Sequence, residues 1–241
     1  MVRRVFVVLA FLATFAVAGL PQWYYSIKDT KIQKEEFFHI LKPLVEKENQ
    51  KVLMERAFII AYFQYKKRHK EISLPLKEKF EAIVKKYRIK NRENMEEFLQ
   101  KIDAIPVSLV LAQAALESGW GKSRFAKEAN NLFGEWTYGK KGLVPKNRKP
   151  GQKHKIRIFN SIQDSIASYM LNLNRHAAYK EFRMARYLAR KSGKQFSGLQ
   201  AAMTMEHYSG IGERYNYLVR SIIKKHALHR LEERATYVTA L

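Results

Sequence analysis

The sequence contains no cysteine, and acidic residues are scarce in it. Without cysteine the chain has no disulfide framework, no cysteine-ligated zinc site and no thiol nucleophile. Its 22 Asp and Glu residues stand against 45 Lys and Arg residues, which gives a formal net charge of +23. An excess of positive charge this large predicts polyanionic partners, among them nucleic acid, anionic lipid and acidic cell-wall polymers.

Repeats and low-complexity linkers are also lacking. The length of 241 residues fits one sizeable domain, or one domain with a helical extension. A hydrophobic content of 46%, with 14 Phe and 13 Tyr, supplies a core and excludes a wholly disordered polycation.

The first 20 residues have the pattern of a leader. An apolar run over 5–20 follows Arg3 and Arg4 and contains a small-x-small triplet at 16–18, which is typical of a secretory signal. Three aromatic residues at 23–25 follow, and aromatic residues favour membrane interfaces, so an uncleaved membrane anchor is the alternative. In both cases we expect the rest of the chain to cross a membrane, which argues against a nucleic-acid partner.

Hydrophobic periodicity predicts a mainly α fold. Apolar residues recur at three- and four-residue spacings through most of the chain, and Pro43 predicts a kink or break in the first helical run. The predicted helices cover about 28–68, 75–87, 93–102, 107–117, 123–129, 162–173, 178–190, 198–205 and 213–225.

Two strand patterns, at 133–138 and 155–159, flank a turn-rich loop, so we expect a small β-hairpin lobe on a helical body. The predicted organisation is a leader or anchor over 1–20, a basic helical extension over 21–104, a principal domain over 105–226 and a tail over 227–241.

Glu117 ends an apolar predicted helix, directly before Ser118-Gly119-Trp120-Gly121. A carboxyl group against apolar walls has a raised pKa because its charged form is disfavoured, and a carboxyl that is protonated near neutral pH can donate a proton to a leaving glycosidic oxygen. The two glycines let a sugar approach the backbone closely, and Trp120 offers a flat face for stacking. A capped or paired surface carboxylate is the alternative at this point.

The residues on either side of Glu117 make its interpretation as a proton donor more specific. Residues 112–123, followed by Asn-Asn-Leu-Phe-Gly at 130–134, resemble the glucosaminidase domain of glycoside hydrolase family 73, a family of peptidoglycan hydrolases. Phe159-Asn160-Ser161 resembles the family's strand-to-helix segment, and Tyr208-Ser209 with Tyr215 resembles its closing tyrosine motif. The resemblance covers about 105–223 and is strongest to the family's Bax-like members in Gram-negative bacteria.

The resemblance implies a lysozyme-like fold (mainly α, α+β) whose β-lobe flanks a groove for peptidoglycan glycan strands. The bond cleaved would be the β-1,4 link from N-acetylglucosamine to N-acetylmuramic acid. Glu117 takes the role of general acid, and Tyr208 takes a catalytic place near the scissile sugar. The expected substrate contacts are Trp120, Asn131, Phe133, Tyr138 and Tyr215. An exported protein is expected, in the periplasm or anchored in the inner membrane and facing the periplasm.

One departure from the family bears on mechanism. Several members carry a second carboxylate in the hairpin, whereas 137–159 contains Lys and Arg but no Asp or Glu. Three explanations are open. The substrate's own 2-acetamido group attacks the anomeric carbon, with Tyr208 steadying the charge; Glu135 or Asp164 acts as the base from an adjacent position; or the protein binds glycan and cuts it poorly.

Two other functions are alternatives. A lytic transglycosylase or lysozyme-type muramidase also works with one glutamate, and a non-catalytic wall-binding scaffold binds without cleaving. His154, His176 and His207 lack the spacing of metal ligands, so we expect no metal and no cofactor. The expected partners are peptidoglycan strands and, beyond them, anionic membrane or wall polymers, bound by a monomer.

Overall fold

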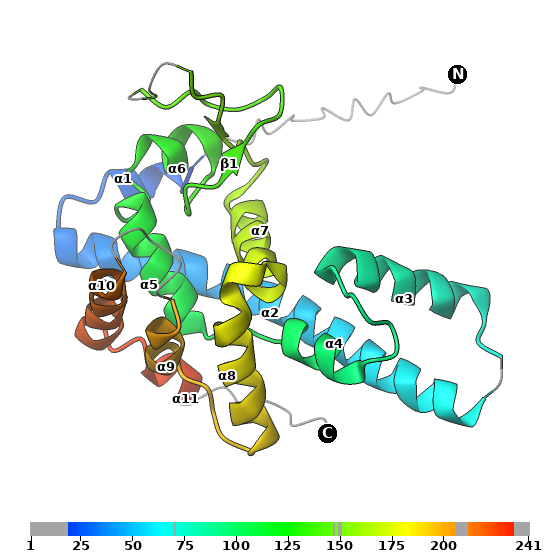
Figure 1. Ribbon diagram of the computed structural model, residues 1–241. Coiled ribbons are helices and arrows are strands. Elements are labelled where there is room, and N and C mark those ends of the chain that lie inside the picture. Colours follow the sequence, from blue (N-terminus) through cyan, green and yellow to red (C-terminus); the bar gives the residue numbers. More distant parts are fainter. Residues whose placement is uncertain (1–18, 70, 147, 149–150, 206–211, 234–241) are drawn as a thin grey trace, which may run out of the picture.

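The computed structural model describes residues 19–69, 71–146, 148, 151–205 and 212–233. Helices make up most of this part of the chain, and a two-stranded antiparallel sheet completes it (Figure 1). The mainly α fold with a small β lobe is therefore confirmed. In chain order the elements are α1 (Gln22–Tyr25), α2 (Thr30–Arg68), α3 (Leu74–Tyr87), α4 (Met95–Lys101), α5 (Val107–Ser118), α6 (Arg124–Ala129), β1 (Trp136–Thr137), β2 (Lys155–Ile156), α7 (Ile162–Arg175), the 3-10 turn η1 (Ala177–Tyr179), α8 (Lys180–Lys191), α9 (Gly198–Met203), α10 (Glu213–Lys225) and α11 (Arg230–Glu233).

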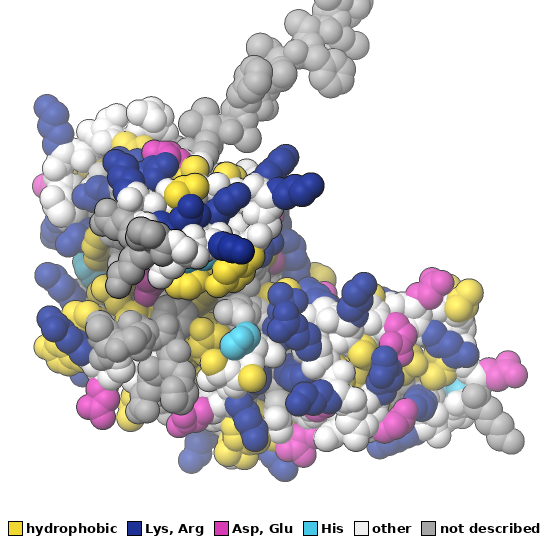
Figure 2. Space-filling model, turned by 45° about the horizontal axis from the view of Figure 1, so that its top comes forward, with side chains coloured by type: hydrophobic (Ala, Val, Ile, Leu, Met, Phe, Trp, Pro, Cys, Tyr) yellow, Lys and Arg dark blue, Asp and Glu magenta, His cyan; other side chains and the backbone are white. Residues whose placement is uncertain are grey.

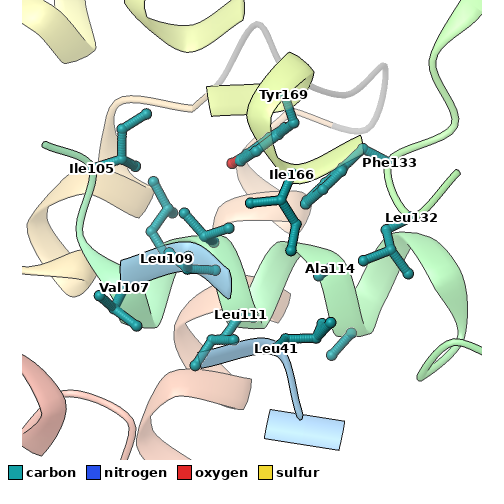
Figure 3. Close-up of a cluster of buried hydrophobic side chains, with 14 of the residues drawn as sticks. Leu41, Ile105, Val107, Leu109, Leu111, Ala114, Leu132, Phe133, Ile166 and Tyr169 are labelled. Carbon is teal, nitrogen blue, oxygen red and sulfur yellow. The ribbon is translucent and has the colours of Figure 1, made fainter. Parts of the chain in front are cut away.

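A helical body surrounds α5, which contacts α2, α9, α10 and α11. Residues 107–115 of α5 are all buried, as the apolar sequence of this helix predicts. Figure 3 shows side chains of α5 with Leu41 of α2 and with Ile166 and Tyr169 of α7 in one buried cluster. Removing this much apolar surface from water is the main stabilising contribution to the body.

Helix α2 links this body to an arm that consists of the second half of α2 together with α3 and α4 (Figure 1). The predicted break at Pro43 is absent, and α2 runs unbroken for 39 residues. The two neighbours of Pro43 on the buried face, Leu41 and Val45, are fully buried. Their packing offsets the backbone hydrogen bond that a proline removes from a helix.

The arm has a core of its own, built largely from aromatic side chains. Tyr62 stacks on Phe80 with ring centroids 4.2 Å apart, and Phe63 meets Phe98 edge to face at 5.5 Å. The predicted extension over 21–104 thus contributes to two cores: α1 and the first half of α2 pack into the body, whereas the later residues build the arm.

The β lobe is the predicted hairpin, with strands shorter than expected. Trp136 pairs with Ile156 and Thr137 with Lys155. After the hairpin, Ser161 caps α7 by accepting a hydrogen bond from the backbone N–H of Asp164 at 3.1 Å.

Most of the predicted leader, residues 1–18, lies outside the described residues. Its last two residues are placed: Gly19 donates its backbone N–H to Asn130 Oδ1 at 2.6 Å, and the Leu20 side chain is buried. Among the helices of the described segments, none combines the length and the apolar character that a membrane crossing requires.

Candidate active site

A cleft of about 590 Å³ lies where the end of α5, the foot of the hairpin, α7 and η1 meet. Glu117 and Glu135 both line it, and Phe133, Ser168 and Tyr179 belong to its walls. The ring of Phe133 is stacked on that of Tyr169 with centroids 3.8 Å apart, and Figure 3 shows the two side by side. Two carboxyl groups on an aromatic wall are thus brought together from positions 18 residues apart in the chain.

Glu117 occupies the last turn of α5. Gly119 ends the helix in the left-handed region, with φ of 55°, and the Ser118 hydroxyl pins the following turn by accepting from the Gly121 N–H at 2.7 Å. The Glu117 side chain opens into the cleft. Burial raises the pKa of its carboxyl group, and a hydrogen bond with Tyr215 partly offsets this effect. The carboxyl therefore holds its proton to a higher pH than an ordinary glutamate does.

A chain of hydrogen bonds stands behind this carboxyl. The Tyr169 hydroxyl donates to Gln113 Oε1, and Gln113 Nε2 donates to the Tyr215 hydroxyl at 2.9 Å. Because the Tyr215 oxygen accepts from Gln113, its own proton is free to be donated to Glu117. Gln113 is fully buried and lies one helical turn before Glu117, on the same face of α5. The network holds the carboxyl in one orientation.

Glu135 precedes β1 at the foot of the hairpin. Its Oε2 accepts from the Ser168 hydroxyl at 2.8 Å and lies 3.6 Å from a guanidinium nitrogen of Arg157. Burial raises the pKa of this carboxyl, and the Ser168 hydrogen bond and the charges of Arg157 and Arg175 act against the rise. Its Oε1 is buried and has no hydrogen-bond partner in the described part of the chain, so within that part the carboxyl is held through Oε2.

Asn131 has a positioning role rather than the predicted contact with substrate. It is 1% exposed, its Nδ2 donates to the carbonyls of Glu135 and Arg157 at 2.9 Å, and its Oδ1 accepts from the Glu135 N–H at 3.0 Å. The two bonds to Glu135 hold the first side of the hairpin's foot, and the bond to Arg157 ties it to the second side. Asn131 therefore fixes the backbone that carries Glu135.

The sequence predicts that Trp120 stacks on a sugar and that Gly121 lets a sugar approach the backbone, but both residues pack against the N-terminal part of the chain. Trp120 is not among the residues that line the cleft; its ring packs edge-on against Phe37 and Phe38 of α2. A Cβ added to Gly121 would lie 2.5 Å from Leu20, so this glycine serves packing of the chain against residue 20 rather than approach of a sugar. Both corrections follow from the docking of α1 and α2 on this turn.

The other predicted residues divide among several places. Phe133 lines the cleft, whereas Tyr215 is buried behind Glu117. Tyr138 is 77% exposed and lies on the hairpin, outside the cleft lining. Asp164 lines a neighbouring cavity instead of the cleft. Tyr208 lies outside the described residues. Among the described residues no group of His, Asp or Glu side chains is arranged to hold a metal ion.

Sequence reasoning missed several residues of the site. Trp136 is 61% exposed, lines the cleft and stacks on His154 with centroids 4.2 Å apart. Gln113 carries a signal that was available, since it is the one amide in an apolar helix, four residues before Glu117. The cleft residues of α7 (Ser168, Asn172, Arg175) likewise form a polar stripe at helical spacing.

Comparisons with known proteins give the family of this chain. Residues 92–228 match the family model Glucosaminidase, described as mannosyl-glycoprotein endo-beta-N-acetylglucosaminidase. The match covers more than half of the chain, which therefore belongs to the Glucosaminidase family and is by class a glycoside hydrolase.

Two kinds of curated relative stand out. The chain is 31% identical over 189 residues to Protein bax of Escherichia coli K12, a match that covers 76% of this chain and 66% of that protein. It is 35% identical over 88 residues to the peptidoglycan hydrolase FlgJ of the same strain and 31% identical to that of Salmonella typhimurium, covering 28% of each. The matches thus span just under two thirds of one relative and about a quarter of the other. No solved structure gives a significant match.

Proposed function

We propose that this protein hydrolyses the glycan strands of peptidoglycan at the β-1,4 bond from N-acetylglucosamine to N-acetylmuramic acid, with Glu117 as the general acid. The observation that carries the proposal is a raised-pKa carboxyl that opens into a cleft of about 590 Å³ and is held by a buried hydrogen-bond network. Membership of the Glucosaminidase family and the likeness to FlgJ, named a peptidoglycan hydrolase, support the choice of substrate.

Glu117 acts by giving its proton to the glycosidic oxygen as the bond to the anomeric carbon breaks. Tyr215 holds the carboxyl while the proton leaves and stabilises the carboxylate that results. Trp136, which is 61% exposed, offers apolar ring surface at the cleft on which the face of a sugar can lie, and Phe133, stacked on Tyr169, backs the cleft wall.

Glu135 is our candidate for the second catalytic group. It supplies the carboxylate that 137–159 lacks, from the foot of the hairpin and in the same cleft as Glu117. As a base it activates a water on the far face of the sugar, which inverts the anomeric configuration, whereas attack by the substrate's acetamido group retains it. Proton NMR of the first product formed distinguishes the two routes: an inverted anomer supports Glu135, and a retained one overturns it.

The test of the activity itself is the identity of the sugar ends that are released. Digestion of purified sacculi is expected to yield N-acetylglucosamine at the new reducing ends, read by mass spectrometry after borohydride reduction. Reduced N-acetylmuramic acid would identify a muramidase, and a 1,6-anhydro sugar would identify a lytic transglycosylase. Binding of sacculi without new ends would identify a scaffold.

The pH profile of Tyr215→Phe is expected to move in a stated direction. A general acid must hold its proton, so kcat/KM falls as pH rises through the pKa of Glu117. The hydroxyl of Tyr215 lowers this pKa, and removing it raises the pKa, so the alkaline fall occurs at a higher pH. The matched control is Tyr169→Phe, which loses a buried hydroxyl bonded to Gln113 rather than to Glu117 and should shift less. A shift of the Tyr215→Phe profile to lower pH contradicts this role.

Export is the second part of the proposal. The basic start, the apolar run and the small-x-small triplet over 3–18 support a leader or anchor that carries the enzyme to the periplasmic side, where its substrate lies. Cell fractionation of the full chain, with detection of the protein in periplasmic and inner-membrane fractions, tests it.

A further inference from the structure

A second cavity lies beside the cleft. Its volume is about 420 Å³, and it shares Arg157, Ser168 and Arg175 with the cleft as lining residues. Residues of α2 and α3, among them Lys51 and Lys86, form its other wall. We call this space the side cavity. It is the place where the arm contributes directly to the surroundings of the cleft, since none of the three helices that build the arm supplies a residue to the cleft lining.

The side cavity carries more positive than negative charge. Its described lining holds four cationic side chains (Lys51, Lys86, Arg157, Arg175) and two acidic ones (Glu48, Asp164). The two lysines already have partners, because Lys51 lies 2.6 Å from Glu48 and Lys86 lies 2.7 Å from Glu55. The two arginines are on the side shared with the cleft.

Arg175 is the one cationic residue of this lining that has no counter-ion among the described residues. It donates a hydrogen bond to the Lys86 carbonyl at 3.2 Å, but no carboxylate of the described residues lies within ion-pair distance of it. Arg88 and Arg157 lie near enough to lower its pKa by charge repulsion, after the larger effect of burial, and Glu135 is the acid that acts against them. Figure 2 shows Lys and Arg side chains both over the hairpin lobe and where the body meets the arm. Clustered guanidinium groups of this kind favour a bound anion.

The rest of the lining suits a peptide. Phe159, Met170, Leu171 and Val52 give the side cavity an apolar side, and its volume is that of a pocket for a small ligand. Asp164 adds a carboxylate with no ion-pair partner among the described residues, so an ammonium group also has a place there. Charges of both signs beside short apolar surface match an extended peptide that bears carboxylates and an amine.

We propose that the side cavity binds the peptide stem of peptidoglycan, with a stem carboxylate on Arg175, and this inference rests on the proposed function. The stem is attached to N-acetylmuramic acid, next to the bond to be cleaved, so a glycan in the cleft presents its peptide close by. The guanidinium fork of Arg175 matches a carboxylate in geometry and charge. The side cavity thereby makes the enzyme selective for glycan that still carries peptide.

The experiment compares two substrates, intact peptidoglycan strands and the same strands freed of peptide by an amidase. In Arg175→Gln, kcat/KM on the peptide-bearing strands is expected to fall about tenfold relative to peptide-free strands, the loss of one charge-assisted hydrogen bond. The measured quantity is the ratio between the substrates, so an effect on Glu135 that is common to both cancels. Lys51 lines the side cavity but not the cleft, and its charge adds to that of Arg175 although Glu48 offsets part of it, so Lys51→Gln should change the ratio in the same direction by a smaller factor. Lys31→Gln, exposed near the start of α2, is the control with no expected change.

The outcomes separate this inference from the function on which it rests. An unchanged ratio in both Arg175→Gln and Lys51→Gln, with wild type cleaving both substrates, overturns the side cavity as a peptide site and leaves the hydrolase intact. Cleavage of neither substrate by wild type overturns the proposed function. In that case calorimetry with free stem peptide decides: binding that Arg175→Gln weakens supports the inference, and no binding to wild type ends it.

Discussion

Replacing Glu117 by glutamine is expected to lower kcat on peptidoglycan at least ~100-fold, the loss typical of a positioned proton donor. The substitution keeps the size of the side chain and leaves an amide oxygen that can still accept from Tyr215, so the network behind it persists. What disappears is the transferable proton. A factor of ~100 corresponds to about 2.7 kcal/mol of lost transition-state stabilisation. Release of reducing ends from sacculi under saturating substrate measures it.

The control for this variant is Glu128→Gln, the same chemical change on the surface of α6. Glu128 is half exposed and is paired with Arg124 at 2.9 Å within its own helix, away from the cleft lining. The activity of Glu128→Gln should equal that of wild type. Binding of sacculi by Glu117→Gln should also be unchanged, because the carboxyl acts on the reaction and little on ground-state binding. Retention of more than a tenth of wild-type kcat by a folded Glu117→Gln would remove Glu117 from the mechanism.

Local patterns predicted the elements well. Helix α10 occupies 213–225 as its apolar stripe predicts, and the buried α5 follows from an apolar run with a proline before it and a glycine after it. The β-hairpin was also predictable, because its two strand patterns lie close together in the sequence on either side of one loop. Local patterns were insufficient at Pro43, where the sequence predicts a kink or break and the helix continues because its neighbours are packed in the core.

Long-range contacts decided the rest of the site. The hydrogen bond between Gln113 and Tyr215 joins residues 102 positions apart, and no spacing rule connects them. Trp120 looked like a groove residue because its packing partners on α2 lie more than 80 residues earlier in the chain. The sequence left Glu135 and Asp164 as equal candidates for the second carboxylate, and only the fold separates the cleft from the side cavity.

The largest expected change in stability comes from Asp103, a carboxylate with no solvent exposure between the arm and the body. Arg190 of α8 binds it through two hydrogen bonds of 2.7 and 2.6 Å, and Arg56 of α2 lies 3.6 Å away. Arg186, which is 3% exposed, donates to the backbone carbonyls of Asp103 and Ala104 at 3.0 and 3.1 Å. Three guanidinium groups therefore converge on one acidic residue and its backbone.

Asp103→Asn is expected to lower the free energy of unfolding by about 3–5 kcal/mol, the usual cost of leaving buried charge uncompensated. Burial already lowers the pKa of Arg186 to about 10, and Asp103 is the first group that acts against this effect. Without the carboxylate, Arg56, Arg186 and Arg190 repel one another in a site that water reaches poorly. Urea unfolding followed by both circular dichroism and tryptophan fluorescence measures the change and checks that arm and body unfold together.

The same experiment tells charge compensation from simple loss of a contact. Glu93→Gln breaks an exposed pair with Lys66 of 2.6 Å and should cost no more than about 1 kcal/mol. If uncompensated charge is the cause, adding Arg190→Gln to Asp103→Asn removes one of the repelling groups, so the double variant should be more stable than the sum of the single changes implies. Additive losses, or a loss for Asp103→Asn no larger than that for Glu93→Gln, would contradict the account. Since α2 and α3 of the arm form one wall of the side cavity, the junction at Asp103 also holds that wall against the body.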